Sequence, residues 1–184
     1  AKNVTLQLNA AGNATLAAAS VNNGSTDNCT ATGNLTLAIN KTSFNCADLG
    51  ANTVTLTVTD AAGNQSTATS TITIVDNIAP VAIAQNINLQ LDASGNATLT
   101  TSSVNNGSSD NCTAAGILTL GLSKTSFTCA DLGANSVTLT VTDASGNQAT
   151  ANATITVVDA IAPTAISQNL TVLLDASGNA SLAA

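Results

Sequence analysis

The chain has 184 residues, and 44% of them are hydrophobic, which is enough for one or two folded domains. All ten acidic residues are Asp, the net charge is −7, and the sequence contains no His, Arg, Glu, Trp, Tyr or Met. The lack of His excludes Ser–His–Asp and Cys–His catalysis, so we expect no enzyme. The lack of a basic patch argues against nucleic-acid binding, and the lack of a long apolar run argues against membrane insertion.

An internal repeat dominates the sequence. When residues 1–83 are placed over residues 84–166 without a gap, 60 of the 83 positions are identical. A period of 83 residues is longer than the roughly 20–50 residues of solenoid repeats, so it predicts self-contained domains in tandem. We expect a first repeat at 1–80, a second at 81–163 and an incomplete third at 164–184. The incomplete repeat is expected to be either the cut end of a longer array or a segment that pairs with a neighbouring chain.

Strands and turns alternate along each repeat. In the first repeat, strands are expected at 4–8, 14–18, 35–39, 53–59 and 67–75. In most of them apolar and polar residues alternate, which is the period of a strand with one buried face. Polar turn residues separate the strands, and Pro80 stiffens the crossing into the next repeat. The pattern predicts an all-β fold of tandem immunoglobulin-like antiparallel β-sandwich domains, with about 83 residues per repeat.

Two cysteines occur in each repeat, 17 positions apart: Cys29 and Cys46, then Cys112 and Cys129. The recurring even count predicts one disulfide inside each repeat, Cys29–Cys46 and Cys112–Cys129. Closing a loop of this length would stabilise a repeat by about 3 kcal/mol. Buried free thiols are the alternative. Two cysteines without a histidine cannot complete the four ligands of a structural zinc site.

The Asp residues recur at turns and strand ends, and two interpretations stay open. Carboxylate and amide oxygens are ligands that Ca²⁺ prefers, so calcium could bind at the boundary between repeats. Asp and Asn in turns also bond to their own backbone without a metal. The candidate calcium ligands are Asp60, Asn64, Asp76, Asn77, Asp143, Asn147 and Asp159.

Three motifs recur at constant spacing: Lys-Thr-Ser-Phe-x-Cys-Ala-Asp-Leu-Gly, then Val-Thr-Leu-Thr-Val-Thr-Asp-x-x-Gly-Asn, then Val-Asp-x-Ile-Ala-Pro. Together they resemble the hyalin-repeat (HYR)-like, immunoglobulin-like modules of large secreted surface proteins of gliding and related Gram-negative bacteria. The resemblance implies an extracellular location at the bacterial cell surface and a stalk or adhesive role. Such relatives often carry another cysteine in the last strand, which this chain lacks around Ala68 and Ala151.

These observations favour a structural spacer in an extracellular fibre or adhesin, whose partners are the neighbouring repeats of the same chain. One alternative is a filament subunit that joins like chains by strand addition. Another is an adhesive module that binds a surface glycan or protein. Binding surfaces are enriched in aromatic residues and Arg, and this chain has only two Phe and no Arg.

Overall fold

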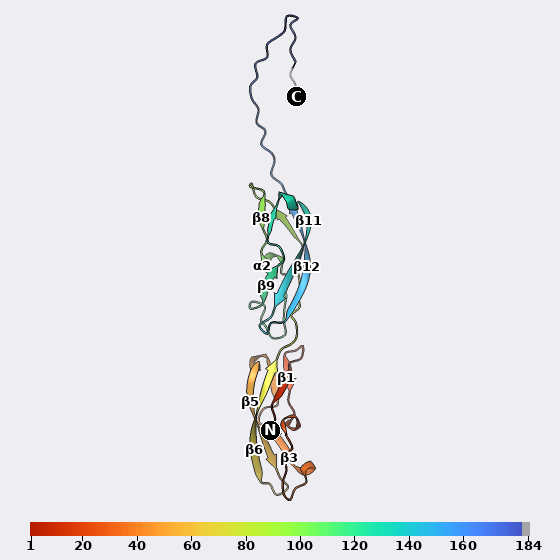
Figure 1. Ribbon diagram of the computed structural model, residues 1–184, viewed down its shortest axis with the longest axis vertical. Helices are drawn as coiled ribbons and strands as arrows, with labels where there is room; N and C mark the ends of the chain where they lie inside the picture. The colour runs from red at the N-terminus through yellow and green to blue at the C-terminus, as the bar shows by residue number, and fades with distance from the viewer. Residues whose placement is uncertain (182–184) are drawn as a thin grey trace.

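A computed structural model describes residues 1–181 and shows two β-sandwich units placed end to end along one long axis (Figure 1). Unit 1 comprises the strands and helices of residues 4–75, and unit 2 those of residues 87–158. The units are built alike because their sequences repeat. The all-β class predicted from the sequence is confirmed.

Unit 1 contains six strands and three short helical turns. In chain order they are β1 (Val4–Gln7), β2 (Asn13–Thr15), α1 (Ala18–Val21), η1 (Thr32–Asn34), β3 (Thr36–Ile39), β4 (Ser43–Asn45), η2 (Cys46–Asp48), β5 (Gly50–Thr59) and β6 (Gln65–Val75). Unit 2 repeats this order without a counterpart of η1, as β7 (Ile87–Gln90), β8 (Asn96–Thr98), α2 (Thr101–Val104), β9 (Thr119–Leu122), β10 (Ser126–Thr128), η3 (Cys129–Asp131), β11 (Gly133–Thr142) and β12 (Gln148–Val158).

Each unit pairs a four-stranded sheet with a two-stranded one. In unit 1 the larger sheet has the order β1-β6-β5-β3 and the smaller one pairs β2 with β4; unit 2 uses β7-β12-β11-β9 and β8-β10. The pairs are antiparallel except the first strand of each unit, which runs parallel to the last, with Val4 opposite Ile72 and Ile87 opposite Ile155. The first and last strands of each unit therefore point the same way, and those of unit 1 point toward unit 2.

Each unit has its own hydrophobic core. Alternate residues of β5 and β6, such as Val54 and Ile72, are fully buried, as period-two patterning requires. Phe44 in β4 fills the space between the sheets of unit 1, and Phe127 does the same in unit 2. Each core contains aliphatic side chains and one aromatic ring, as the composition predicts.

The described residues beyond unit 2 are exposed and form no strand. They include a turn, in which the backbone N–H groups of Ser177 and Asn179 donate to the Asp175 carboxylate. This turn forms because its hydrogen bonds are local, whereas a strand needs a partner strand. Residues 182–184 of the predicted third repeat lie outside the described residues. Among the described residues, no helix is long and apolar enough to cross a membrane.

Candidate functional site

The two units meet at a joint, which we define as residues 76–83, Cys46, the loop 109–113 and the turn 143–147. Unit 1 contributes the residue that follows β6 and the cysteine that follows β4. Unit 2 contributes the loop before β9 and the turn between β11 and β12. The joint contains three features that bear on function: a bound linker, a disulfide and a group of carboxylates.

The linker between the units is held against unit 2. The backbones of Val81 and Ser109 exchange two hydrogen bonds, with N···O distances of 2.7 and 3.1 Å. Ile83 N–H donates to the Ser108 hydroxyl at 3.0 Å, and Pro80 is buried. The linker is therefore hydrogen-bonded along unit 2 and is not a free hinge.

A disulfide joins the units. It links Cys46 of unit 1 to Cys112 of unit 2, with a Cα–Cα distance of 5.2 Å, while Cys29 and Cys129 are unpaired and exposed within residues 1–181. The Cys112 side chain packs against the core of unit 1. A closed loop of this length contributes about 4 kcal/mol on the chain-entropy model.

The intra-repeat pairing predicted from the sequence, Cys29–Cys46 and Cys112–Cys129, is wrong. Cys29 lies beside the turn after β5, where the hydroxyl of Thr30 accepts a hydrogen bond from Ala61 N–H. Cys46 lies at the other end of the unit, just before β5 begins. A ten-residue strand spans about 30 Å, whereas a disulfide requires a Cα–Cα distance below about 7 Å.

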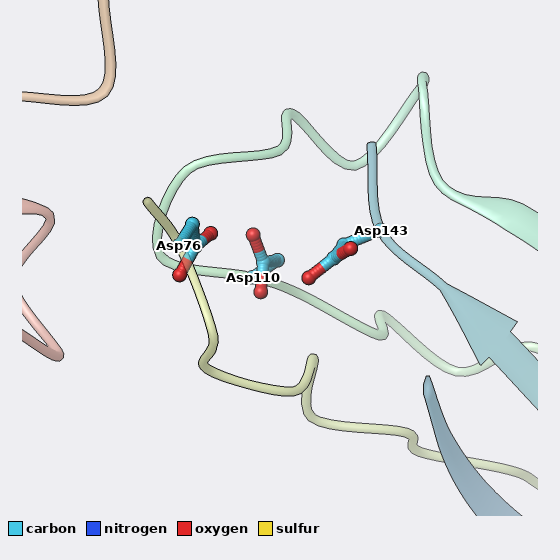
Figure 2. Close-up of side chains that lie close together, drawn as sticks. All are labelled: Asp76, Asp110 and Asp143. Atoms are coloured by element: carbon cyan, nitrogen blue, oxygen red, sulfur yellow. The ribbon is translucent and has the colours of Figure 1, made fainter. Parts of the chain in front are cut away.

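Three carboxylates converge next to the disulfide. Asp76, Asp110 and Asp143 each offer an oxygen within 4.8 Å of the others, and Figure 2 shows Asp110 lying between the other two. Asp76 is 4% exposed and Asp143 is 6% exposed. At 4.8 Å, two carboxylates repel each other by about 3 kcal/mol at an effective dielectric constant of about 20. The described residues form two ion pairs, Lys41–Asp48 and Lys124–Asp131, and both are outside the joint.

Local hydrogen bonds orient these carboxylates. The backbone N–H groups of Cys112 and Thr113 donate to Asp110 Oδ2 at 2.9 and 2.7 Å. The backbone and side-chain N–H groups of Asn147 donate to both oxygens of Asp143 at 2.8 Å. The amide of Asn147 also donates to the backbone oxygen of Asp76 at 3.1 Å, which ties unit 2 to the end of unit 1.

Other oxygens at the joint have no donor. Asp76 Oδ1 accepts hydrogen bonds from Ile78 N–H and from the Asn111 amide, at 3.1 and 3.3 Å. Asp76 Oδ2, Asp110 Oδ1 and Asn111 Oδ1 are buried and accept no hydrogen bond from the residues that the structure describes. Burying an acceptor without a partner is costly, most of all when it is charged. The joint therefore presents oxygen ligands of the kind that hard cations take.

The structure brings together some of the predicted calcium ligands and separates the others. Asp76, Asp143 and Asn147 meet at the joint, whereas Asn77 is exposed beside it. Asp60 and Asn64 bond to each other at the opposite end of unit 1, and Asp159 is exposed at the far end of unit 2. Three of the seven predicted ligands, Asp76, Asp143 and Asn147, therefore lie together at the boundary between these two repeats.

Sequence reasoning left two residues of the joint out of the ligand set, Asp110 and Asn111. A signal was present, because Asp110-Asn111-Cys112 repeats Asp27-Asn28-Cys29 and each copy precedes a cysteine. The missing information was that the first cysteine of a repeat lies at the boundary with the repeat before it. At the exposed end of unit 1, the N–H groups of Cys29 and Thr30 bond to Asp27 and lower the pKa of its carboxyl.

Comparisons with known proteins place the chain in no family. No family model matches it, and no curated protein matches it. Among solved structures, it is similar to human protocadherin-24 EC1-2, with 12% identity, a TM-score of 0.41, and coverage of 84% of this chain and 94% of that one. It is also similar to the fibronectin(III)-like modules of Clostridium thermocellum CbhA, with 12% identity, a TM-score of 0.30, and coverage of 70% and 73%. These likenesses are too weak to carry a functional argument.

Proposed function

We propose that the chain is a structural, non-catalytic spacer of an extracellular fibre or adhesin, of the HYR-like kind found on bacterial surfaces. The observation that carries this proposal is the Cys46–Cys112 disulfide, which joins one repeat covalently to the next. Disulfides form and persist in oxidising compartments, which supports a location outside the cytoplasm. An adhesive module that binds glycan or protein stays an alternative, with its binding residues unassigned.

The stiffness of the joint follows from its geometry. A linker alone is one covalent connection and allows the units to swing and twist. The disulfide is a second connection at a different point, so it restricts the motion to one axis. The hydrogen bonds from Asn147 to the backbone oxygens of Asp76 and Ile78 restrain the linker itself, because they hold its first residues against unit 2. Together the linker, the disulfide and these hydrogen bonds account for the end-to-end arrangement of the two units in Figure 1.

Small-angle X-ray scattering on the oxidised full chain tests the spacer. We expect the scattering of two units held end to end, and a broader distribution of interdomain distances for the double variant Cys46→Ser/Cys112→Ser. The matched control is Cys29→Ser/Cys129→Ser, which removes two cysteines of the same repeat positions but leaves the joint intact. The spacer function is excluded if the oxidised wild type is as flexible as the Cys46→Ser/Cys112→Ser variant.

A second candidate function is head-to-tail assembly of like chains, because the two exposed ends carry the two halves of the joint. A Cβ atom built on Gly95 would lie 2.7 Å from Cys129 Sγ, as one built on Gly12 would lie 2.6 Å from Cys46 Sγ. Asp159 and Cys129 line one cleft beside Pro163. They correspond to Asp76 and Cys46, the residues by which unit 1 meets unit 2. Cys29, at the position of Cys112, is exposed at the opposite end of the molecule.

Peptide mapping of the oxidised full chain tests this assembly. At high protein concentration we expect covalent multimers on a non-reducing gel, crosslinked through peptides that contain Cys29 of one copy and Cys129 of another. Cys29→Ser and Cys129→Ser should each abolish multimers larger than dimers. Crosslinks found only as Cys29–Cys29 or Cys129–Cys129 would rule out head-to-tail joining, as would a chain that stays monomeric.

A further inference from the structure

The joint contains more negative charge than its contacts neutralise. Asp76, Asp110 and Asp143 approach within 4.8 Å of one another, and two of these side chains are over nine-tenths buried. The chain has three Lys and no Arg; Lys41 and Lys124 pair with other Asp residues. Within residues 1–181, no ion pair reaches the three carboxylates. An arrangement of this kind calls for a cation.

A second observation is independent of the charge. Asp76 Oδ2 is buried in a side chain that is 4% exposed, and it accepts no hydrogen bond from the described residues. Asp110 and Asn111 are half-buried residues, but their Oδ1 atoms are also buried and accept no hydrogen bond from the described residues. The other oxygen of Asp110 accepts hydrogen bonds from two backbone N–H groups of its own loop, and the other oxygen of Asp76 accepts them from Ile78 N–H and the Asn111 amide. Each carboxylate therefore keeps one oxygen free.

We propose that Asp76, Asp110 and Asp143, together with the side-chain oxygen of Asn111, form a calcium site that spans the two repeats. Ca²⁺ is the metal of choice because all the donors are oxygen and come from irregular loops, whose geometry Ca²⁺ accepts. Mg²⁺ demands near-octahedral geometry and gives up its water reluctantly, while Zn²⁺ prefers nitrogen and sulfur ligands. Figure 2 shows that the ligands come from both units, with Asp76 after β6 and Asp143 after β11.

Calcium at this position would act on the orientation of the repeats. Asp76 directly follows the last strand of unit 1, and the other ligands belong to unit 2, so the complete site exists only when the units are in this arrangement. A ligand that binds one arrangement shifts the population toward it. This inference concerns the same joint as the proposed function, but it does not require the chain to be a spacer.

Isothermal titration of the metal-free, oxidised full chain with CaCl₂ tests the site. We expect one strong site per chain, and Asp110→Asn should weaken its affinity at least tenfold. At a free calcium concentration of about 100 times Kd, the wild-type Tm should rise by about 10–20 °C. Asp110→Asn should lose this rise and, in EDTA, should be at least as stable as the wild type because it removes a repelling charge.

Matched controls come from the repeat itself. Asp60→Asn and Asp159→Asn change the positions of Asp143 and Asp76 at the exposed ends of the molecule, so each should keep the wild-type affinity for calcium. Calcium binding should persist in excess MgCl₂. The proposal is overturned if the wild-type chain binds no calcium, or if the Asp110→Asn variant binds calcium as tightly as the wild type. It is also overturned if Asp60→Asn loses as much affinity as Asp110→Asn.

Scattering separates this inference from the spacer function. If the oxidised chain is an extended pair in EDTA and shows no calcium binding, the calcium site fails and the spacer stands. If calcium binds with the expected variant pattern while the units stay mobile, the site stands and the spacer fails.

Discussion

At the scale of single residues, Gly12 shows how closely the joint is packed. Gly12 has a positive φ of 72°, and a Cβ at this position would lie 2.6 Å from Cys46 Sγ and 3.1 Å from the backbone oxygen of Asn111. Any other side chain would both strain the backbone and push against the disulfide. We therefore expect Gly12→Ala to leave the Cys46–Cys112 disulfide incompletely formed. Thiol titration in denaturant should count more than two free thiols per chain.

The control for Gly12 is Gly63→Ala. Gly63 also has a positive φ, of 89°, but a Cβ there would meet nothing within 4 Å. This variant should lose about 1 kcal/mol from backbone strain alone and keep the wild-type count of free thiols. If both variants form the disulfide fully, close packing at Gly12 does not govern the bond.

Ion pairs next to each Phe make a small, pH-dependent contribution. The ammonium of Lys41 hydrogen-bonds Asp48 and, with the N–H of Asn45, lowers the pKa of that carboxyl below its ordinary 3.8; Lys124 and the N–H of Thr128 do the same to Asp131. Because the folded pKa is depressed, this stabilisation is fully present above the unfolded pKa. It is lost as the pH falls below about 4 and through the folded pKa.

Urea denaturation between pH 7 and pH 2 checks this assignment. Asp48→Asn/Asp131→Asn should be less stable than the wild type at pH 7, and the difference should shrink toward pH 2. The effect should be modest because both pairs are partly exposed to solvent, which screens them. A difference that stays constant over this range would assign the effect to the capping of η2 and η3 rather than to charge.

At the scale of elements, the sequence predicted the strands best where one face of a strand is buried and the other is exposed. The alternation in β5 and β6 located both strands, because their buried positions recur at every second residue. The short β4 was not predicted, since three residues around Phe44 are too few to show a period. The parallel pairing of β1 with β6 was also not predicted, because alternation is the same in either direction.

The single aromatic ring of each unit leads to a prediction about independence. Phe44 is 2% exposed and belongs to a core that is separate from the core around Phe127. Replacing a buried Phe by Ala costs about 3–5 kcal/mol. Phe44→Ala should therefore destabilise unit 1 and leave unit 2 folded.

Trypsin can report which unit has opened, because the chain has three Lys and no Arg. Lys41 lies in unit 1 and Lys124 in unit 2, so brief proteolysis in increasing urea should cut Phe44→Ala after Lys41 first. Phe127→Ala should reverse the order. If either variant is cut at both sites at the same urea concentration, the units unfold as one.

At the scale of the whole molecule, the sequence did not show how the joint between the two units is built. Asp76 and Asp143 were among the predicted ligands because they recur at strand ends. The disulfide partners were not predictable from the sequence. Cys46 could pair with Cys29 before it or with Cys112 after it, and the spacing of the cysteines does not show which pair forms. The choice depends on which end of the sandwich each cysteine occupies, and only the folded β5 sets that distance.

Because the sequence repeats, the same joint should form between any two successive repeats. Adding a repeat tests this. A chain that continues from residue 166 with a further copy of residues 84–166 would place a new first cysteine opposite Cys129. Gly95 and Asp159 are already at the positions that Gly12 and Asp76 occupy at the existing joint. We expect this longer chain to form a second disulfide from Cys129 to the first cysteine of the added copy. Its intact mass should fall by four hydrogens on oxidation, leaving two free thiols.

The matched control for the longer chain carries Cys129→Ser and should form one disulfide. Peptide mapping distinguishes the pairings, because a bond inside the added copy would give the same mass but a different crosslinked peptide. If the added cysteines paired with each other, the interdomain disulfide would be a property of one joint. If Cys129 takes the expected partner, the same joint can follow every repeat, because each repeat carries its second cysteine at one end and its first at the other.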